Sequence, residues 1–368
     1  MIQSFRALRG LAKLPRLEDV TPCAGPGCPR ISILFGARDE EEKLPAALAT
    51  LLAQDHPNYE VIAVDDRSSD ATPRILDEFA ARYNNLKVVH IRELPPGWLG
   101  KPHALECAYE QSTGEWLIFT DADVYFTPDV LGRSFALAQR ENFDHLSLFG
   151  RLDLSGFWET AATIYFSVGF AFGVEPWRVP NPKSKRYMGA GYFQMVRRAA
   201  YEAVGTHRRL ALEVVEDMKL GKIIKLGGFR SGVAIANEKV HLRWSRGLGE
   251  IVRGLTKNFF AASGFSVFQT LVSAAGPIIV SVVPYVALFF TRGLALIFAA
   301  IACAIATMFL AEGARKTRVN WLYGFTQPIG GLVFSYALLR SMVVTLWQGG
   351  IVWRGTFYPL EELKRGLV

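Results

Sequence analysis

Short apolar runs alternate with segments of helical periodicity between residue 31 and about residue 137. The apolar runs predict strands at 31–35, 61–64, 88–91 and 116–120, and the segments between them predict helices at 41–52, 72–83 and 103–111. A further helix is expected to begin at Thr127 and Pro128, because proline is favoured in the first helical turn. Continuous apolar strands are typical of sheets that are covered on both faces. The pattern therefore predicts an α/β domain with a mostly parallel sheet.

The next segment is less regular. Strands are expected at 143–154 and 189–196, a helix at 212–226 that ends at Gly227 and Gly228, and a basic helix at 247–260. The stretch between the two strands is rich in aromatic residues and proline. We interpret its aromatic residues as core or interfacial anchors rather than as sugar-stacking groups. They are Trp158, Tyr165, Phe166, Phe170, Phe172 and Trp177.

Two long stretches near the C-terminus, 259–291 and 293–311, contain no charged residue. A helix that spans a bilayer needs about 20 mostly apolar residues, so both stretches are candidates, and we expect a hairpin that turns near Arg292. Two buried core helices are the alternative, although core helices rarely lack charge for so long. Residues 319–347 are also apolar but contain Gly330, Gly331 and Arg340. This segment is either a third span or a re-entrant segment.

Residues 1–29 combine four basic residues with apolar residues that recur every three positions. This pattern predicts a short amphipathic helix on anionic headgroups, followed by a linker rich in proline and glycine. No uninterrupted apolar stretch follows the charges, so the segment is not a signal peptide. Cys23 and Cys28 lie in the linker without a nearby histidine or third cysteine. We interpret them as free thiols rather than metal ligands.

The amino-acid composition excludes several classes of protein. The chain has 368 residues, of which 50% are hydrophobic, so intrinsic disorder is excluded. Its four cysteines are too few for a disulfide scaffold. The net charge of +7 is modest, and no basic stripe with interleaved aromatic residues predicts a nucleic-acid partner. Basic residues flank the apolar stretches, which places the soluble part on the cytoplasmic face. They are Arg253, Lys257, Arg315, Lys316 and Arg318.

Paired acids follow two of the expected strands. Asp65 and Asp66 come directly after one strand, and Asp121 and Asp123 follow another. In open parallel sheets, ligands bind beyond the carboxyl ends of the strands. Carboxylates that meet there repel one another unless a cation joins them, and oxygen ligands suit Mg²⁺ or Mn²⁺, which would bridge a diphosphate. Aspartates that merely favour turns are the alternative, but two such pairs favour the metal.

These acids belong to a series of motifs that resembles the family 2 glycosyltransferases, which have the GT-A fold. Residues 31–40 are similar to the family's opening strand and P-A-x-N-E motif, with Gly36 in place of the proline and Asp39 in place of the asparagine. Residues 51–57 and 64–70 resemble the region whose acid recognises the nucleotide base. Residues 100–105 resemble the G-K-x-x-A-L segment, whose lysine approaches the nucleotide or its diphosphate.

Three further motifs follow in the family's order. Residues 121–123 match the DxD motif that holds the metal, and Glu216 and Asp217 match the ED motif, whose aspartate is the general base. Residues 243–244 match the end of a Q/R-x-x-R-W motif, although Val240 stands where glutamine or arginine is usual. Without this resemblance, Asp217 would be read as an acid favoured at a helix N-terminus.

The resemblance covers residues 30–260 and implies roles for individual residues. Asp217 is expected to be the catalytic base, and Asp121 and Asp123 are expected to bind Mg²⁺ or Mn²⁺. The residues expected to bind the nucleotide sugar are Ala37, Arg38, Glu40, Asp65, Asp66, Lys101, Asp121, Asp123, Arg243 and Trp244. His103 and His241 are either active-site contacts or ordinary polar packing. Residues 189–191 either let the backbone approach a substrate or form a tight turn.

Residues 353–359 resemble subfamilies that glycosylate membrane lipids, such as the ceramide glucosyltransferases and the hopanoid- and carotenoid-associated transferases. Those relatives usually begin with an N-terminal transmembrane helix, which this chain lacks. We therefore expect a hexosyltransferase anchored in a bacterial inner membrane. It would transfer sugar from a nucleotide diphosphate sugar, expected to be a UDP-sugar, to a lipid hydroxyl, and it would invert the anomeric centre in one displacement. The expected regions are 1–29, 30–260 (GT-A domain), 261–350 (two to three membrane helices) and 351–368 (tail).

Three other functions are compatible with parts of the pattern. A polyprenyl-phosphate glycosyltransferase has an acceptor that is already an anion and therefore needs no general base. A processive polysaccharide synthase is disfavoured by Val240 and by the small number of spans. A non-catalytic membrane scaffold is disfavoured because Asp66, Asp123 and Asp217 occur together.

Overall fold

The computed structural model describes residue 7 and residues 9–368. The chain forms two compact units. We call residues 10–152, 175–243 and 366–368 the sheet unit, and residues 1–9, 153–174 and 244–365 the helical unit. Residues 153–174 and 244–260, which were expected in the GT-A domain, thus cluster with the apolar C-terminal helices.

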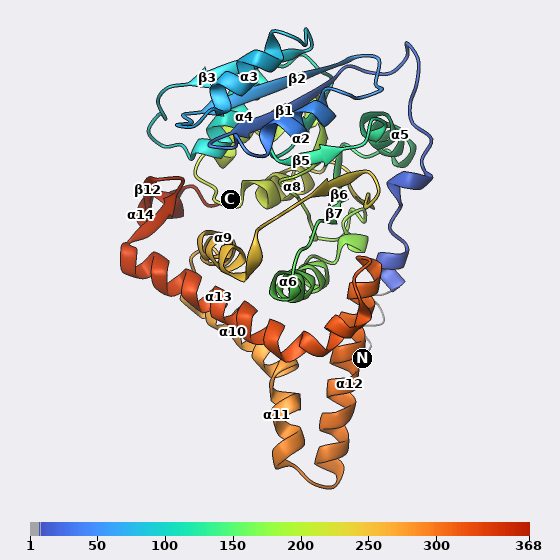
Figure 1. Ribbon diagram of the computed structural model, residues 1–368, viewed down its shortest axis with the longest axis vertical. Helices are drawn as coiled ribbons and strands as arrows, with labels where there is room; N and C mark the ends of the chain where they lie inside the picture. Colours follow the sequence, from blue (N-terminus) through green and yellow to red (C-terminus); the bar gives the residue numbers. More distant parts are fainter. Residues whose placement is uncertain (1–6, 8) are drawn as a thin grey trace. The chain divides into compact units, whose positions relative to one another are not determined.

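A seven-stranded sheet forms the centre of the sheet unit (Figure 1). Its strand order is β3-β2-β1-β4-β8-β6-β9. The bounds are β1 Ile31–Ala37, β2 Tyr59–Asp66, β3 Leu86–Ile91, β4 Trp116–Phe119, β6 His145–Phe149, β8 Gln194–Arg197 and β9 Ser231–Ile235. The first four strands run parallel, β8 is antiparallel to both of its neighbours, and β6 and β9 are parallel. The prediction of a mostly parallel α/β sheet is confirmed.

Helices cover both faces of this sheet because its strands are apolar on both sides. In β1, Ile33 and Phe35 join one hydrophobic cluster, whereas Leu34 joins the other. The first face packs against α2 (Leu44–Leu51), α3 (Thr72–Ala80) and α5 (Val130–Glu141). The second face packs against α4 (Gly100–Glu110), α7 (Arg198–Ala203) and α8 (Glu216–Leu226). The carboxyl ends of the parallel strands lie at a common edge.

A second, three-stranded sheet has the order β5-β10-β7. Its strands are β5 (Val124–Phe126), β7 (Arg151–Leu152) and β10 (Val240–Leu242). Three short 3₁₀ helices, η1 (Leu17–Asp19), η2 (Pro176–Arg178) and η3 (His207–Leu210), complete the sheet unit. Residues 120–123 connect β4 of the large sheet to β5 of the small one, so this connection carries the DxD motif.

The helical unit contains seven α-helices among the described residues. They are α6 (Phe157–Val174), α9 (Gly247–Ala262), α10 (Val267–Ser281), α11 (Val283–Phe290), α12 (Leu294–Lys316), α13 (Gln327–Gln348) and α14 (Leu360–Arg365). A 3₁₀ helix, η4 (Trp321–Thr326), precedes α13, and a β-hairpin of β11 (Gly350–Trp353) and β12 (Thr356–Pro359) follows it.

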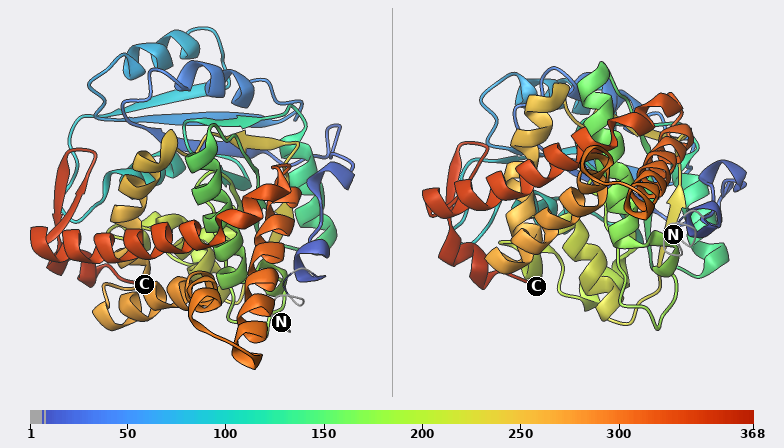
Figure 2. Two further views of the ribbon diagram at one scale, coloured as in Figure 1. Left: turned by 60° about the horizontal axis from the view of Figure 1, so that its bottom comes forward. Right: turned by 90° about the horizontal axis from the view of Figure 1, so that it is seen from below.

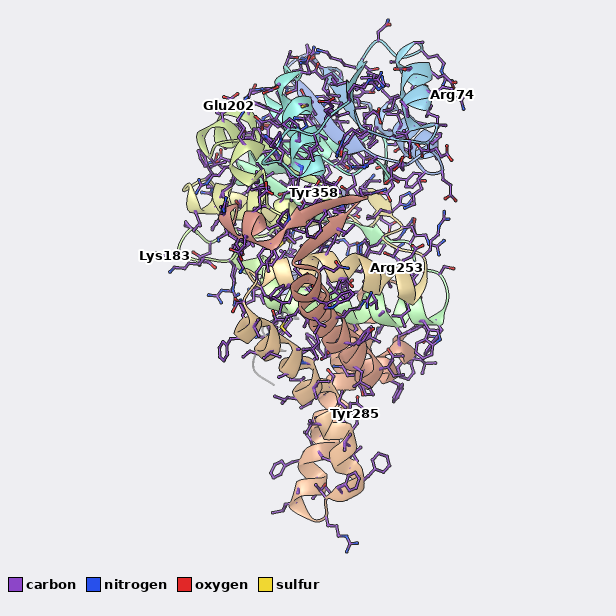
Figure 3. All side chains as sticks on the ribbon, turned by 90° about the vertical axis from the view of Figure 1, so that its left-hand side faces the viewer. Arg74, Lys183, Glu202, Arg253, Tyr285 and Tyr358 are labelled. Carbon is purple, nitrogen blue, oxygen red and sulfur yellow. A yellow bond between two sulfur atoms is a disulfide. The ribbon has the colours of Figure 1, made fainter. Side chains whose placement is uncertain are left out.

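Two of the described helical segments, 294–316 and 321–348, are long and apolar enough to cross a membrane. The pair α10 and α11, bent by 46°, makes a third candidate if it is one span. Helices α11 and α12 form a hairpin that turns between Phe290 and Leu294, as expected, and that projects from the rest of the helical unit with Tyr285 on its first helix (Figures 1 and 3).

Several local predictions are wrong. Cys23 and Cys28 are not free thiols: they form a disulfide, because the turn at residues 25–27 brings their Cα atoms to 6.2 Å. The aromatic stretch before residue 175, for which no element was predicted, is the helix α6. Helix α5 begins at Val130, after Pro128 instead of at it. The N-terminal amphipathic helix falls partly on residues 1–6 and 8, which lie outside the described residues, whereas residues 9–12 are helical.

Candidate active site

The carboxyl ends of β1, β2 and β4 bring most of the expected site residues to one edge of the large sheet. Ala37, the last residue of β1, pairs in register with Asp65 near the end of β2. Arg38 follows Ala37, and the Glu40 N–H donates to Thr72 Oγ1 over 2.8 Å. The next strand along, β4, leads into the DxD connection. The sheet topology thus assembles groups that are up to about a hundred residues apart in the chain.

Asp65 is buried and held in a fixed orientation. Its Oδ1 accepts the Ser68 N–H over 3.2 Å, and its Oδ2 lies 3.2 Å from His90 Nδ1. The other ring nitrogen of His90 lies 3.0 Å from Asp77 Oδ1. Burial lowers the pKa of His90, but the bonds to Asp77 and Asp65 outweigh it, so the pKa of His90 is raised. The Asp65 carboxylate therefore faces a histidine that favours its protonated form.

Asp66 is neutralised by arginine. Arg67 donates from Nε to Oδ1 over 2.7 Å and from Nη2 to Oδ2 over 3.1 Å, and Arg38 Nη1 lies 4.0 Å from Oδ2. This two-point contact fixes the carboxylate plane. A Cβ atom on Gly100, at the start of α4, would collide with Asp66 Oδ2, so only glycine fits there.

Lys101 lies one residue further along α4 and joins two acids. Its Nζ is 2.6 Å from Asp121 Oδ1 in the DxD connection and 2.9 Å from Glu216 Oε1 at the start of α8. Burial alone lowers the pKa of a lysine. Here the charges of Asp121 and Glu216 prevail, and the pKa of Lys101 is raised well above its ordinary value. Lys101 is therefore a fixed cation at this edge.

Asp217 stands beside this pair in the first turn of α8. Its Oδ1 accepts the Met218 N–H over 2.7 Å, and its Oδ2 accepts the Gly191 N–H over 2.9 Å. Burial and the neighbouring charge of Glu216 raise the pKa of Asp217 to about 6, although Lys101 opposes them.

Gly191 marks the point where three of these side chains converge. A Cβ atom on Gly191 would lie 3.1 Å from Lys101 Nζ, 3.2 Å from Asp121 Oδ2 and 3.3 Å from Asp217 Oδ2. These groups come from α4, the DxD connection and α8. Gly189 is equally constrained, because its Cβ atom would collide with the Asp217 carbonyl. The backbone of residues 189–191 therefore lies close to Asp217, and its approach to a substrate stays a prediction.

Asp123, the second acid of the DxD motif, pairs with Lys43, whose Nζ lies 2.7 Å from its Oδ2. Among the described residues, no group of three or more histidine, cysteine, aspartate or glutamate side chains forms a metal cluster. The donor set nevertheless fits a divalent cation of the Mg²⁺ type. Asp121 and Asp123 offer carboxylate oxygens, and such cations are usually held by one or two carboxylates together with substrate phosphates.

Four other candidate residues make contacts elsewhere in their own units. Arg243 follows β10 at the end of the sheet unit. Trp244 belongs to the helical unit, where its ring packs against Phe166 at 4.8 Å. His103 contacts the Cys107 sulfur at 3.7 Å and the Trp98 ring at 5.4 Å. His241 stacks on Tyr125 at 4.9 Å.

Three polar neighbours of the site were not among the expected residues: Lys43, Arg67 and His90. A signal for His90 exists, because β2 and β3 are adjacent parallel strands and the registered partner of Asp65 is His90. Lys43 and Asp123, which pair with each other, are 80 residues apart in the chain, and no periodic pattern in the sequence links them.

Comparison with known proteins agrees with this arrangement. Residues 32–205 match the family model described as Glycosyl transferase family 2. A beta-monoglucosyldiacylglycerol synthase from Trichormus variabilis is 38% identical over 115 residues, which cover 31% of this chain and 24% of the synthase. A poly(ribitol-phosphate) beta-glucosyltransferase from Bacillus spizizenii is 30% identical over 117 residues, which cover 31% of this chain and 18% of that protein. The matched segment thus spans less than a quarter of these relatives.

Among solved structures, a mannosyltransferase from Pyrobaculum calidifontis in complex with GDP-Man and Mn²⁺ superposes with a TM-score of 0.56. It is 22% identical, and the match covers 94% of each chain, so this likeness concerns the fold. The fold is of the GT-A type. The match over residues 32–205 identifies this part of the chain, a little under half of it, as a glycosyltransferase domain of the family 2 type.

Proposed function

We propose that this protein transfers a sugar from a nucleotide diphosphate sugar, expected to be a UDP-sugar, to a hydroxyl group of a membrane lipid, with inversion at the anomeric carbon. The observation that carries the proposal is the convergence of Lys101, Asp121 and Asp217 around Gly191. A cation, a DxD acid and an acid of raised pKa at the carboxyl edge of the strands are what such a transfer requires.

The donor end of the site is assigned to the carboxyl ends of β1, β2 and β4. Asp65 and Asp66 would contact the nucleoside, with Arg38 and Arg67 beside them. Lys101 would stabilise the negative charge that develops on the leaving diphosphate. A Mg²⁺ or Mn²⁺ ion held by Asp121 and Asp123 would supply further charge neutralisation there. Arg243 remains a proposed phosphate contact, because arginine suits bidentate binding of phosphate.

Asp217 is assigned the role of general base. It would accept the proton of the acceptor hydroxyl while that oxygen bonds to the anomeric carbon and the nucleoside diphosphate leaves with the electron pair of the broken bond. A base works best when its pKa is near the operating pH, and the pKa of Asp217 is raised to about 6. The Gly191 and Met218 N–H groups orient the carboxylate. A single displacement inverts the anomeric centre.

A lipid acceptor is supported by the apolar helical unit and by the glucosyldiacylglycerol synthases among the relatives. An active site in a chain with membrane helices can receive a lipid without extracting it from the bilayer. The excess of basic residues near the apolar segments supports a cytoplasmic position for the sheet unit, on a bacterial inner membrane. The sugar depends on pocket shape and is left to experiment.

The test is nucleotide release by the purified full chain in detergent. UDP-sugars are supplied with Mn²⁺ or Mg²⁺, with and without a lipid extract. Asp217→Asn is compared with wild type and with Asp19→Asn, a matched change at an exposed aspartate of the sheet unit. We expect lipid to stimulate UDP release, and we expect Asp217→Asn to reduce that release by about 10²–10⁴-fold while Asp19→Asn does not.

Two outcomes would overturn the proposal. Lipid-stimulated release that survives Asp217→Asn would favour a phosphate acceptor, which needs no base, and so a polyprenyl-phosphate transferase. No release from any donor by a chain that retains its thermal unfolding transition would leave the non-catalytic scaffold.

A further inference from the structure

Helix α13 exposes a stripe of large apolar side chains along its whole length. The stripe consists of Ile329, Leu332, Tyr336, Leu339, Val343 and Leu346. The intervals are three or four residues, so these positions share one face of the helix. Val343 is 57% exposed, and Trp347 at the end of the stripe is 85% exposed. In water, such a face would cost free energy along about 26 Å of helix.

The opposite face of α13 is buried and includes glycine and hydroxylated residues that contact neighbouring helices. Ser341 Oγ donates to the Thr256 carbonyl over 2.6 Å and accepts the Phe260 N–H over 2.9 Å, which ties α13 to α9. Ser335 Oγ donates to the Ala274 carbonyl of α10 over 2.8 Å. Gly330 lies so close to the Tyr165 ring of α6 that a Cβ atom would collide with it. The outer face of α13 is therefore apolar, whereas its inner face combines these small and hydroxylated residues with Ala337 and Leu338, which belong to a buried hydrophobic cluster shared with α9.

Helix α10, which runs beside α13 in the helical unit (Figures 1 and 2), has the same arrangement. Its buried residues are Thr270, Ala274 and Ser281. Its exposed residues include Phe268, Val272 and Ile279. The two helices thus contact each other through small and polar groups and present apolar side chains outward.

Helix α9 covers the inner side of α13 and is charged. It carries Glu250, Arg253 and Lys257, of which Glu250 and Arg253 are exposed (Figure 3 labels Arg253). Charged side chains are costly in the middle of a bilayer. A helix packed on α9 can therefore contact lipid on its outer side only. It differs in this from a membrane-spanning helix that lipid surrounds.

The apolar stripe continues beyond the end of α13 onto the β-hairpin. Trp347, Val352 and Phe357 line an exposed hollow of about 370 Å³. The Lys257 ammonium lies 3.9 Å from the centre of the Trp353 ring in the same hairpin. Tryptophan and basic residues at the end of an apolar face are typical of the membrane–water interface.

We infer that α13 lies along the membrane surface, with its apolar stripe in the outermost acyl region of one leaflet and its polar face toward α9. The partner of this surface is the lipid bilayer, and the β11–β12 hairpin extends the contact. The inference rests on the membrane association in the proposed function. It gives residues 319–347 a third placement, neither a span nor a re-entrant segment, in which Arg340 reaches the headgroups.

Depth measurements on the full chain in phosphatidylcholine–phosphatidylglycerol vesicles test this placement. A nitroxide is attached to single cysteines at Leu332→Cys, Leu339→Cys, Val343→Cys and Leu346→Cys. The background is Cys107→Ser and Cys303→Ala, and the Cys23–Cys28 pair stays oxidised. Relaxation by oxygen and by a water-soluble nickel chelate gives the depth of each label. Leu226→Cys, an exposed leucine of the sheet unit, is the matched control.

We expect all four stripe labels to lie within one leaflet, with an oxygen-to-nickel accessibility ratio several-fold above that of Leu226→Cys. A span would instead distribute these positions over about 20 Å of depth, with the deepest label near Leu339. That gradient, or labels that are as accessible to nickel as the control, would overturn the inference. UDP release is measured on the same samples, so a failure of sugar transfer is distinguishable from a failure of this placement.

Discussion

The two units of the chain each have buried hydrophobic clusters but differ in what their helices expose. In the sheet unit, β1 places Ile33, Leu34 and Phe35 in two hydrophobic clusters. In the helical unit, α13 buries Ser335 and Ser341 and exposes a stripe of leucine and aromatic side chains. If the exposed stripe of α13 contacts lipid, as inferred above, its exposure costs little, because apolar groups have little reason to leave a solvent that is itself apolar.

Because of this difference, apolar residues at helical spacing mark a buried face in one unit and an exposed face in the other. In α4, the apolar positions identify the face that packs on the sheet. In α13, the same three- and four-residue spacing identifies the face that points away from the protein. The distinction lies in the number of charged residues: α4 carries Lys101, Glu106 and Glu110 among its 11 residues, whereas Arg340 is the one charged residue among the 22 of α13.

The largest expected difference between the two units is tested by replacing one phenylalanine in each of them. Phe35 is fully buried, whereas Phe290 is 83% exposed on the α11–α12 hairpin. We expect Phe35→Ala to destabilise the fold by about 3–5 kcal/mol. Phe290→Ala should change stability by no more than about 0.5 kcal/mol but weaken vesicle binding by about tenfold or more. Thermal unfolding in detergent and vesicle flotation measure the two effects, and equal destabilisation would contradict the comparison.

Substitution of Lys101 tests the cluster of charged side chains around Gly191 in the sheet unit. Lys101→Ala removes the cation beside Asp121 and Glu216, and we expect sugar transfer to fall by about 10²-fold with vesicle binding unchanged. Lys87→Ala, at an exposed lysine of the same unit, is the control and should retain full transfer. Steady-state kinetics measure the effect. A loss no greater than that of the control would remove Lys101 from the site.

A change of pH should also separate the two units. The pKa of Asp217 is raised to about 6, so its ionised form, the form that accepts a proton, is lost as the pH falls through 6. At pH 5 about a tenth remains ionised, and transfer should be about tenfold slower than at pH 7 or above. The helical unit contains no histidine, so vesicle binding should change little over this range. A flat pH–rate profile would contradict the assignment of Asp217.

Substitution of His90 is expected to have the smallest effect, and it tests the part of the site that is assigned to the nucleotide. His90→Gln keeps a polar group beside Asp65 but removes the charge that the contacts with Asp65 and Asp77 favour. We expect the KM for the nucleotide sugar to rise a few-fold with kcat nearly unchanged, because glutamine keeps a polar contact with Asp65 and the loss is about that of one ordinary hydrogen bond. A purely structural role would instead lower the thermal unfolding temperature and leave KM unchanged.

The elements that could be predicted from the sequence are those with local signals. Continuous apolar strands predict the parallel sheet, and the acids after residues 64 and 120 predict its carboxyl edge. Helix α6 was missed because it is apolar and aromatic nearly all round, so no polar face reveals its period. The Cys23–Cys28 disulfide was missed because its closure depends on the turn between the two cysteines.

The candidate site was predictable as a set of residues but not as an arrangement. Lys101, Asp121 and Asp217 stand in separate motifs, and only the fold brings them around Gly191. The contacts of Lys43 with Asp123 and of Arg67 with Asp66 depend on loop conformation, such as the positive φ of 57° at Arg67. Such conformations are set by tertiary contacts and leave no periodic trace.

The most direct test of the account is to follow the sugar itself. The full chain in lipid vesicles is incubated with a UDP-sugar labelled in the sugar, and the organic and aqueous phases are then separated. The account predicts that the label enters an organic-phase lipid through a glycosidic bond of inverted configuration, and that Asp217→Asn abolishes this transfer. Label that stays in the aqueous phase, or that reaches the lipid with retained configuration, would contradict it.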